Sequence, residues 1–250
     1  MDKKDLGIMI LAAGMGTRMK SDIPKVLHTI NGRSMITCVL ECAVAIAEEK
    51  NIVVIVGHQS ERVKKEISKR FSVSFALQKK LLGTGDAVRA GIPYLPDTVE
   101  NIIVLCGDTP LIKPATISSL VAHHKNYQND LTVLTVSLAD PAGYGRVILD
   151  AHGELLYIRE EDDASPSEKK ISLVNSGIYC ITRQFLVFAL DLIRPNNAQQ
   201  EYYLTDIAGI AKANGARAGH VKANDPRELK GVNTLQELKK LEGLIPDMDL

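Results

Sequence analysis

Short apolar runs alternate with amphipathic segments along the first half of the chain. Runs rich in Val and Ile predict β-strands at Ile8–Leu11, Ile52–Val56, Val73–Leu77, Ile102–Leu105 and Leu131–Val136. Between them, helical periodicity predicts helices at Met35–Glu49, Glu61–Arg70, Thr84–Ala90 and Ile117–Asn126. This alternation is typical of an α/β fold with a Rossmann-like, mostly parallel mixed sheet that is flanked by helices. In such sheets ligands bind outside the carboxyl ends of the strands.

The pattern changes after about residue 137. The second half is predicted to contain a hairpin (Arg146–Leu149 and Glu154–Ile158, joined around His152-Gly153), a mobile surface loop (Glu160 to Lys170), a strand (Val174–Cys180) and helices (Arg183–Leu190 and Thr205–Asn214). We interpret this half as a smaller, β-rich lobe of one continuous domain. A last helix, Thr234 to Leu241, is predicted to bury Leu235, Leu238 and Leu241 on one face. We assign residues 1–232 to the domain and 233–250 to the C-terminal helix and a short acidic tail.

Composition and charge exclude several classes of partner. Thirty Lys and Arg balance thirty Asp and Glu in 250 residues, so no global field attracts nucleic acid or an anionic membrane. With no Trp and 4% aromatic residues, a base-stacking surface is not expected either. We expect no signal peptide, because no long apolar region follows residues 1–5, and no apolar run approaches the roughly 20 residues that span a bilayer. We expect a cytoplasmic enzyme with a small-molecule substrate and four reduced thiols, and nothing in the sequence specifies an oligomeric state.

A glycine-rich turn follows the first predicted strand. It reads Leu11-Ala12-Ala13-Gly14-Met15-Gly16-Thr17-Arg18-Met19, and Pro24-Lys25 comes shortly after. Small residues let a ligand approach the backbone, whose free N–H groups can cradle phosphate oxygens, and Arg18 and Lys25 add positive charge. The sequence contains no P-loop run G-x-x-x-x-G-K-[ST]. A dinucleotide fingerprint is excluded too, because the third glycine and the ribose-binding acid are missing. The turn therefore predicts a nucleoside triphosphate site.

A carboxylate follows another predicted strand, in the run Gly107-Asp108-Thr109-Pro110. Asp108 could be a helix cap or a turn residue, but with a triphosphate loop on the same sheet edge we favour a role as Mg²⁺ ligand. Lys25 could be a solvated surface lysine. A triphosphate that meets a second phosphate, however, requires fixed positive charge, since like charges 4 Å apart repel by about 4 kcal/mol at an effective dielectric constant near 20.

Three further polar residues have less specific signals. Gln78 closes the third predicted strand, and Gly83-Thr84 opens the next helix; an amide with backbone groups of a glycine turn can contact the imide edge of a pyrimidine. Thr84 could equally cap that helix. Asn233 precedes the last helix and by itself indicates only a cap or turn residue.

These motifs together resemble the uridylyltransferase domain of the bacterial N-acetylglucosamine-1-phosphate uridylyltransferases, a family of nucleotidyltransferases. The resemblance covers nearly the whole chain and is most specific at Pro24 to His28 and Asn197 to Asp206. It implies a glycosyltransferase-A-like fold, Mg²⁺ as cofactor, and UTP and N-acetylglucosamine-1-phosphate as substrates. It implies catalytic roles for Arg18 and Lys25, a metal site at Asp108 and Asn233, nucleotide contacts at Leu11, Ala12, Ala13, Gly14, Lys25, Gln78, Gly83, Thr84, Cys106, Gly107 and Asp108, and sugar contacts at Gly145, Glu160, Asn175, Tyr203, Thr205 and Asn233.

The resemblance implies UMP transfer from UTP to N-acetylglucosamine-1-phosphate with release of pyrophosphate. Two departures from the family stand out. Asp162 occupies a position where the family usually has lysine, in the run Glu160-Glu161-Asp162-Asp163-Ala164, and the left-handed β-helix acetyltransferase domain of bifunctional members is not in these 250 residues. The chain is then either a one-activity protein or part of a longer one. The alternatives are a nucleotidyltransferase for another sugar-1-phosphate or another nucleotide, and a nucleotide-binding module without turnover.

Overall fold

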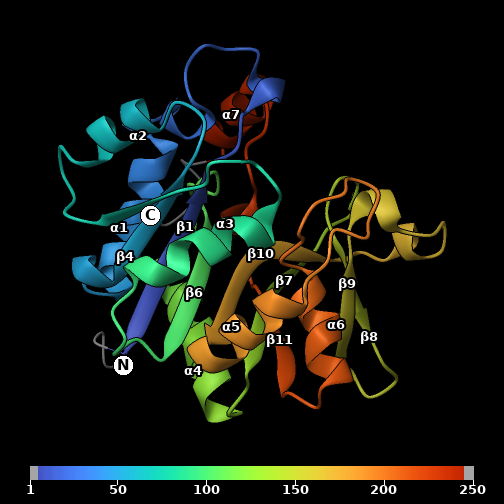
Figure 1. Ribbon diagram of the computed structural model, residues 1–250. Helices are drawn as coiled ribbons and strands as arrows, with labels where there is room; N and C mark the ends of the chain where they lie inside the picture. The colour runs from blue at the N-terminus through green and yellow to red at the C-terminus, as the bar shows by residue number, and fades with distance from the viewer. Residues whose placement is uncertain (1–4, 245–250) are drawn as a thin grey trace.

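A computed structural model describes residues 5–244, and within this range one large sheet forms the centre of the molecule (Figure 1). The sheet order is β11-β7-β10-β6-β1-β4-β5, with β8 and β9 attached to β10. The strands are β1 (Leu6–Ala12), β4 (Ile52–Val56), β5 (Ser74–Leu77), β6 (Asn101–Cys106), β7 (Leu131–Ser137), β8 (Arg146–Leu149), β9 (Leu155–Arg159), β10 (Leu173–Thr182) and β11 (Ala218–Lys222).

The sheet is mostly parallel, as predicted, with one antiparallel strand in its middle. Strands β6, β1, β4 and β5 run parallel to one another, and β11 runs parallel to β7. Strand β10 lies between β6 and β7 and is antiparallel to both. The parallel strands therefore all end at one edge, which is where the glycine-rich turn emerges from β1.

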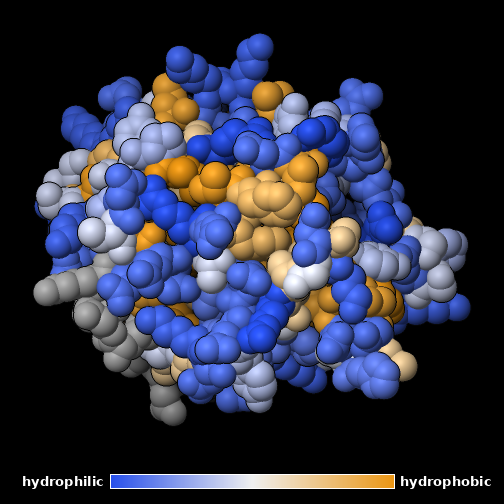
Figure 2. All heavy atoms as spheres, turned by 60° about the horizontal axis from the view of Figure 1, so that its bottom comes forward, coloured by the Kyte–Doolittle hydropathy of each residue, from blue (hydrophilic) through white to orange (hydrophobic). Residues whose placement is uncertain are grey.

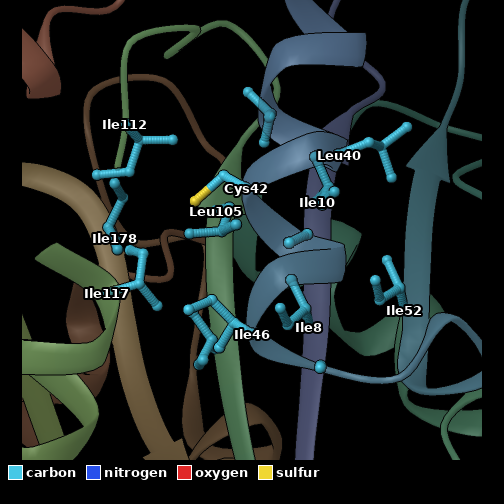
Figure 3. Close-up of a cluster of buried hydrophobic side chains, with 14 of the residues drawn as sticks. Ile8, Ile10, Leu40, Cys42, Ile46, Ile52, Leu105, Ile112, Ile117 and Ile178 are labelled. Atoms are coloured by element: carbon cyan, nitrogen blue, oxygen red, sulfur yellow. The ribbon is translucent and has the colours of Figure 1, made fainter. Parts of the chain in front are cut away.

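Helices cover both faces of the sheet: α1 (Met35–Ile46), α2 (Ser60–Ile67) and α4 (Pro114–Asn126) on one, and α3 (Thr84–Gly91), α5 (Arg183–Leu192) and α6 (Asp206–Ala213) on the other. Alternate strand residues point to opposite faces. Ile8 and Ile10 of β1 pack with Leu40 and Ile46 of α1 in one core, whereas Met9 belongs to the other. Figure 3 shows the α1 side of this packing. Because both faces are covered, the strands are apolar throughout.

A third, smaller apolar cluster lies beyond the carboxyl edge of the sheet. Met19 from the turn after β1 and Ile30 from the following hairpin pack there with Leu111, with Val232, and with Leu238 and Leu241 of α7 (Leu235–Glu242). Helix α7 lies at the top of Figure 1, next to the loop that follows β1. This cluster fixes the turn after β1 and the segment before α7 next to each other, although about 210 residues separate them in sequence.

The structure corrects several boundaries and one buried position. Helix α1 ends at Ile46, β10 is longer than predicted, and the Glu160–Lys170 stretch contains two short 3₁₀ helices, η5 (Glu161–Asp163) and η6 (Glu168–Lys170). Leu235 does not share the buried face of α7, since it is 42% exposed; only Leu238 and Leu241 are buried. The predicted acidic tail, residues 246–250, lies outside the described residues.

Sequence reasoning missed β11 and a small hairpin of β2 (Thr29–Ile30) and β3 (Arg33–Ser34). The hairpin turn consists of Asn31 and Gly32, both with positive φ, at 48° and 75°. Asn-Gly is a strong hairpin signal and could have identified it. Strand β11 lacks an apolar pattern because it is a half-buried edge strand next to β7.

Figure 2 shows the molecule turned so that the bottom of Figure 1 comes forward, away from the edge where the parallel strands end. Apolar surface gathers near the middle of this face. On α5, Val187, Phe188 and Leu192 are 40–46% exposed. No helix within residues 5–244 has both the length and the apolar character needed to cross a membrane.

Candidate active site

The candidate site lies at the carboxyl edge, where the loops after β1, β4, β5 and β6 converge. Short backbone hydrogen bonds hold these loops together: Gly107 N donates to Leu11 O (2.9 Å), and Gln78 N donates to Val56 O (2.9 Å). Residues at or after the ends of β1, β5 and β6 line a cavity of about 390 Å³. The cavity opens at the position that ligands take in open α/β sheets.

Most of the residues predicted to bind the nucleotide line this cavity. They come from the turn after β1, the end of β6, the segment between β5 and α3, and the 3₁₀ helix η2 (Lys25–Leu27): Leu11, Ala12, Ala13, Gly14, Lys25, Gln78, Gly83, Thr84, Cys106 and Asp108. Gly107 lies beneath the lining, where a Cβ would be 3.0 Å from Leu11 O. The lining also contains residues that sequence reasoning did not assign: Met15, Val26, Leu81, Ala87 and Glu201. Met15 and Val26 are next to predicted residues, whereas nothing local indicated Glu201.

The turn after β1 has the properties of a phosphate cradle. Among the described residues, none accepts a hydrogen bond from the backbone N–H of Gly14, Met15 or Gly16. A Cβ at Gly14 would meet nothing within 4 Å, so the backbone there faces open space. Gly16 has φ 63° and faces Lys25, whose Cβ would lie 2.7 Å from an added Cβ. The turn therefore needs glycine where it packs on Lys25 and leaves its amides available to an anion.

Two cations and two oxygen ligands meet at one side of the cavity. Lys25 Nζ forms an ion pair with Asp108 Oδ2 and donates to Asn233 Oδ1 at 2.7 Å. Arg18 Nη2 donates to the same Asn233 oxygen at 3.0 Å. Asp108 lies in the turn after β6 and caps no described helix, and its carboxylate pairs with Lys25. Lys25 is no solvated lysine, since its side chain is only 14% exposed.

The segment before α7 brings Asn233 to this cluster. Val232 N donates to Asp108 O (3.0 Å), and Glu237 Oε2 accepts from Asn233 N (2.6 Å). Thr234, not Asn233, is the N-cap of α7, in a capping box with Glu237. The predicted metal ligands are thus neighbours in space, 125 positions apart in sequence.

The donor set suits a hard divalent cation. Asp108 and Asn233 offer a carboxylate and an amide oxygen, and both already reach one positive group, the Lys25 ammonium. Magnesium is typically held by one or two protein oxygens together with water and substrate phosphates. Within residues 5–244 there is no cluster of three or more His, Cys, Asp or Glu that could hold a metal ion by itself. A metal at Asp108 would therefore depend on the phosphates of a bound ligand for the rest of its coordination.

The Cys106 thiol also faces the cavity but lacks the character of a nucleophile. Burial, with a further contribution from the Asp108 charge, raises the pKa of Cys106 to about 12. The neutral thiol donates to Gly177 O at 3.5 Å. Covalent catalysis at this position is disfavoured, because the thiolate is the reactive form of cysteine.

Gln78 closes β5 at the other side of the cavity and is buried, with 6% exposure. Its Nε2 donates to Gly83 O (3.0 Å) and Asp86 Oδ2 (2.8 Å). Gly83, not Thr84, occupies the N-cap position of α3, and the Thr84 hydroxyl instead accepts from Leu204 N (2.9 Å). The suggestion that Thr84 caps this helix is therefore wrong.

The residues predicted to bind the sugar form a second group beside the cavity rather than in its lining. Thr205 Oγ1 donates to Glu160 Oε1 (2.9 Å), and a Cβ at Gly145 would lie 3.3 Å from Glu160 Oε2. Asn175 N donates to Gly145 O (2.8 Å). Tyr203 is 7% exposed, and its hydroxyl has no hydrogen-bond partner among the described residues. Asn233 belongs to the charge cluster instead.

The electrostatics of this second group are acidic. Burial raises the pKa of Glu160, reinforced by the nearby carboxylates of Asp206, Asp163 and Asp162 and opposed by the hydrogen bond from Thr205. Asp162, which stands where relatives of the resembled family usually have lysine, accepts from Gln199 Nε2 (2.7 Å). Asp163 accepts from Ala198 N (3.0 Å). These carboxylates thus attach the loop after β9 to the segment before α6.

Backbone hydrogen bonds join the two groups. Tyr202 N donates to Leu82 O (2.7 Å), and Gly85 N donates to Tyr202 O (2.7 Å). With the bond between Leu204 N and the Thr84 hydroxyl, they hold the glycine turn before α3 against the irregular segment that leads to Thr205. The cavity lining and the group predicted to bind the sugar are therefore parts of one hydrogen-bonded unit.

The fold and the site define a nucleotide-processing α/β protein, and sequence comparison assigns its family: the nucleotidyl transferase family model matches residues 8–226, so the chain belongs to this family. Among curated proteins it is similar to Bifunctional protein GlmU of Pelotomaculum thermopropionicum, with 46% identity over 95% of this chain and 51% of the relative. The same protein of Clostridioides difficile shares 44% identity over 95% of this chain and 51% of the relative. The GlmU protein of Desulfotalea psychrophila shares 42% identity over 93% of this chain and 68% of the relative.

The chain thus spans about half the length of the first two curated relatives. Among solved structures, a protein from Bacillus anthracis described as a glucose-1-phosphate thymidylyltransferase superposes with a TM-score of 0.73 at 20% identity, covering 98% of this chain and 97% of that one. That likeness confirms the α/β nucleotidyltransferase fold.

Proposed function

We propose that this protein transfers UMP from UTP to N-acetylglucosamine-1-phosphate, giving UDP-N-acetylglucosamine and pyrophosphate. The observation that carries the proposal is the convergence of Arg18, Lys25, Asp108 and Asn233 at one side of the cavity, next to a turn with free amide groups. Membership of the nucleotidyl transferase family and similarity to the GlmU proteins support the reaction class.

In this proposal the cavity holds the nucleotide with its base toward Gln78 and its phosphates toward Gly14 and Lys25. The free N–H groups of Gly14 to Gly16 bind phosphate oxygens, and Arg18 and Lys25 neutralise charge that builds up at the reacting phosphorus. Asp108 and Asn233 would hold Mg²⁺, which would neutralise phosphate charge when bound.

The acceptor phosphate attacks the α-phosphorus in line, a bond to it forms as the bond to the leaving pyrophosphate breaks, and no covalent enzyme intermediate is involved. A general base is unnecessary, because the phosphate oxygen is already ionised. Catalysis then consists of positioning and charge neutralisation. The high pKa of Cys106, the cysteine of the cavity lining, agrees with this direct route.

The acceptor sugar lies on the side of Glu160, Asn175 and Thr205. The Glu160 carboxylate can accept hydrogen bonds from sugar hydroxyl groups.

The test is pyrophosphate release by the purified protein with Mg²⁺ and N-acetylglucosamine-1-phosphate, comparing UTP with CTP, ATP, GTP and dTTP. Release with UTP well above the others supports the reaction, the base and the acceptor together. Release only with dTTP, or only with another sugar-1-phosphate, would refute the assigned substrates while keeping the reaction class. UTP binding without release under any of these conditions would refute the enzyme assignment and favour a binding module.

A further inference from the structure

The orientation of the Gln78 side-chain amide is fixed by its partners. Gly83 O and Asp86 Oδ2 are both acceptors without a hydrogen to donate, and both lie within 3.0 Å of the same Gln78 atom. That atom must therefore be Nε2, because an amide oxygen there would face two other oxygens. The other end of the amide, Oε1, accepts no hydrogen bond from the described residues and belongs to a residue that lines the cavity.

Asp86 is the stronger of these two acceptors. It lies in the first turn of α3, where the helix dipole favours a carboxylate, and it is half-buried. A hydrogen bond to a charged acceptor is roughly twice as strong as one between neutral groups. Gly83 O contributes less to the orientation, because it is neutral and also accepts from Ala87 N (3.2 Å).

A base in the cavity consequently meets an acceptor at Gln78 and no donor. Uracil and thymine carry an N–H at N3, which can donate to Gln78 Oε1. The donor of cytosine on this edge is its 4-amino group, and its N3 is bare. With Gln78 Oε1 opposite ring position 3, the contact made by the N3–H of uracil would become in cytosine a contact between two acceptors. A buried polar group that is left unpaired in this way is an effective means of rejecting the wrong ligand.

We propose that Asp86 is a positioning residue that sets base selectivity: it holds the Gln78 amide so that only the oxygen faces the base, which favours uracil over cytosine. The proposal rests on the proposed function, since it requires that the cavity binds the base of the nucleotide. Asp86 itself does not touch the substrate.

The experiment measures kcat/KM for UTP and CTP in the full chain and in the Asp86→Asn variant. Asparagine is nearly isosteric but can donate as well as accept, so the Gln78 amide can turn over. We expect the UTP-to-CTP ratio to fall by about tenfold or more, which corresponds to about 1.4 kcal/mol. In a Gln78→Ala background the same substitution should leave the ratio unchanged, since the amide that it orients is gone.

A control variant and a comparison of the two nucleotides separate a positioning role of Asp86 from a general structural effect. Glu61→Gln removes an exposed carboxylate from the first turn of α2 and serves as the matched control, with no change expected in the ratio. If Asp86→Asn lowers turnover with both nucleotides equally and the ratio persists, the proposal is overturned. Asp86→Ala, with its thermal transition measured alongside, gives the same decision if the asparagine variant does not fold. A wild-type protein without UTP turnover would instead refute the proposed function.

Discussion

We expect the Gly83→Ala substitution to weaken the fold and both sides of the candidate site. The Gly83 backbone has φ 107° and ψ 176°, a conformation that is essentially restricted to glycine. An added Cβ would lie 2.6 Å from Tyr202 O and 2.9 Å from Tyr202 N. Both contacts are with backbone, which cannot rotate away as a flexible side chain would.

Two effects determine the size of the loss. Forcing a residue with a Cβ into this backbone conformation costs of order 1–3 kcal/mol. Displacing Tyr202 endangers its two backbone hydrogen bonds, with Leu82 and Gly85, which together contribute about 2 kcal/mol. The free energy of unfolding should therefore fall by about 3–5 kcal/mol. The Michaelis constants for nucleotide and sugar phosphate should both rise, because Gly83 O holds Gln78 and Tyr202 precedes the sugar group.

Gly153→Ala is the matched control, since Gly153 has φ 81° but no atom within 4 Å of an added Cβ. It should cost only the backbone term, about 1–2 kcal/mol, and leave both Michaelis constants unchanged. Urea denaturation of the two variants and the wild type gives the comparison. Equal losses in Gly83→Ala and Gly153→Ala would refute the reasoning, because the contact with Tyr202 would then contribute nothing.

Three further substitutions address the chemistry. Asp108→Ala should abolish most metal-dependent turnover while the thermal transition stays near that of the wild type, and near-normal pyrophosphate release across a Mg²⁺ titration would contradict the metal assignment. Lys25→Met removes a charge expected about 4 Å from a phosphate, worth about 4 kcal/mol, so kcat/KM should fall about a thousandfold in the same assay. Burial raises the pKa of Glu160, so at a pH above the ordinary carboxyl pKa its ionised form destabilises the folded state. Glu160→Gln should therefore raise the free energy of unfolding at neutral pH. In the wild type, KM for the sugar phosphate should rise as falling pH protonates Glu160. In Glu160→Gln this contribution should be absent, which leaves only the pH dependence of the substrate phosphate itself.

The sequence predicts those parts of the fold whose residues carry a local pattern. β1, β4 and β6 are continuous apolar runs because helices cover them on both faces, so their positions follow from hydropathy alone. The placement of the turn after β1 and of Asp108 at the carboxyl edge of the sheet is predictable for a related reason, because each follows the end of such a strand. Parallel strands end at a common edge, and the residues that follow them must therefore meet.

What the sequence could not predict depends on partners that are distant along the chain. The sequence pattern predicts a strand where β10 lies, but no local signal places this strand antiparallel between β6 and β7. Asn233 looks like a cap and becomes part of the charge cluster through the packing of α7 on the turn after β1. Glu201 reaches the cavity lining in the same indirect way, from a loop that precedes α6.

The junction between the two groups explains why distant residues must be held so firmly. The turn before α3 belongs to the cavity proposed for the base, and the segment from Tyr202 to Thr205 leads to the group proposed for the sugar. Gly85 and Thr84 bind directly to Tyr202 and Leu204. An in-line attack requires the acceptor phosphate and the α-phosphorus at a defined separation and angle, and errors of an ångström reduce the rate strongly. A backbone-to-backbone junction fixes that separation better than two independently mobile lobes would, and it requires glycine at the point of closest approach.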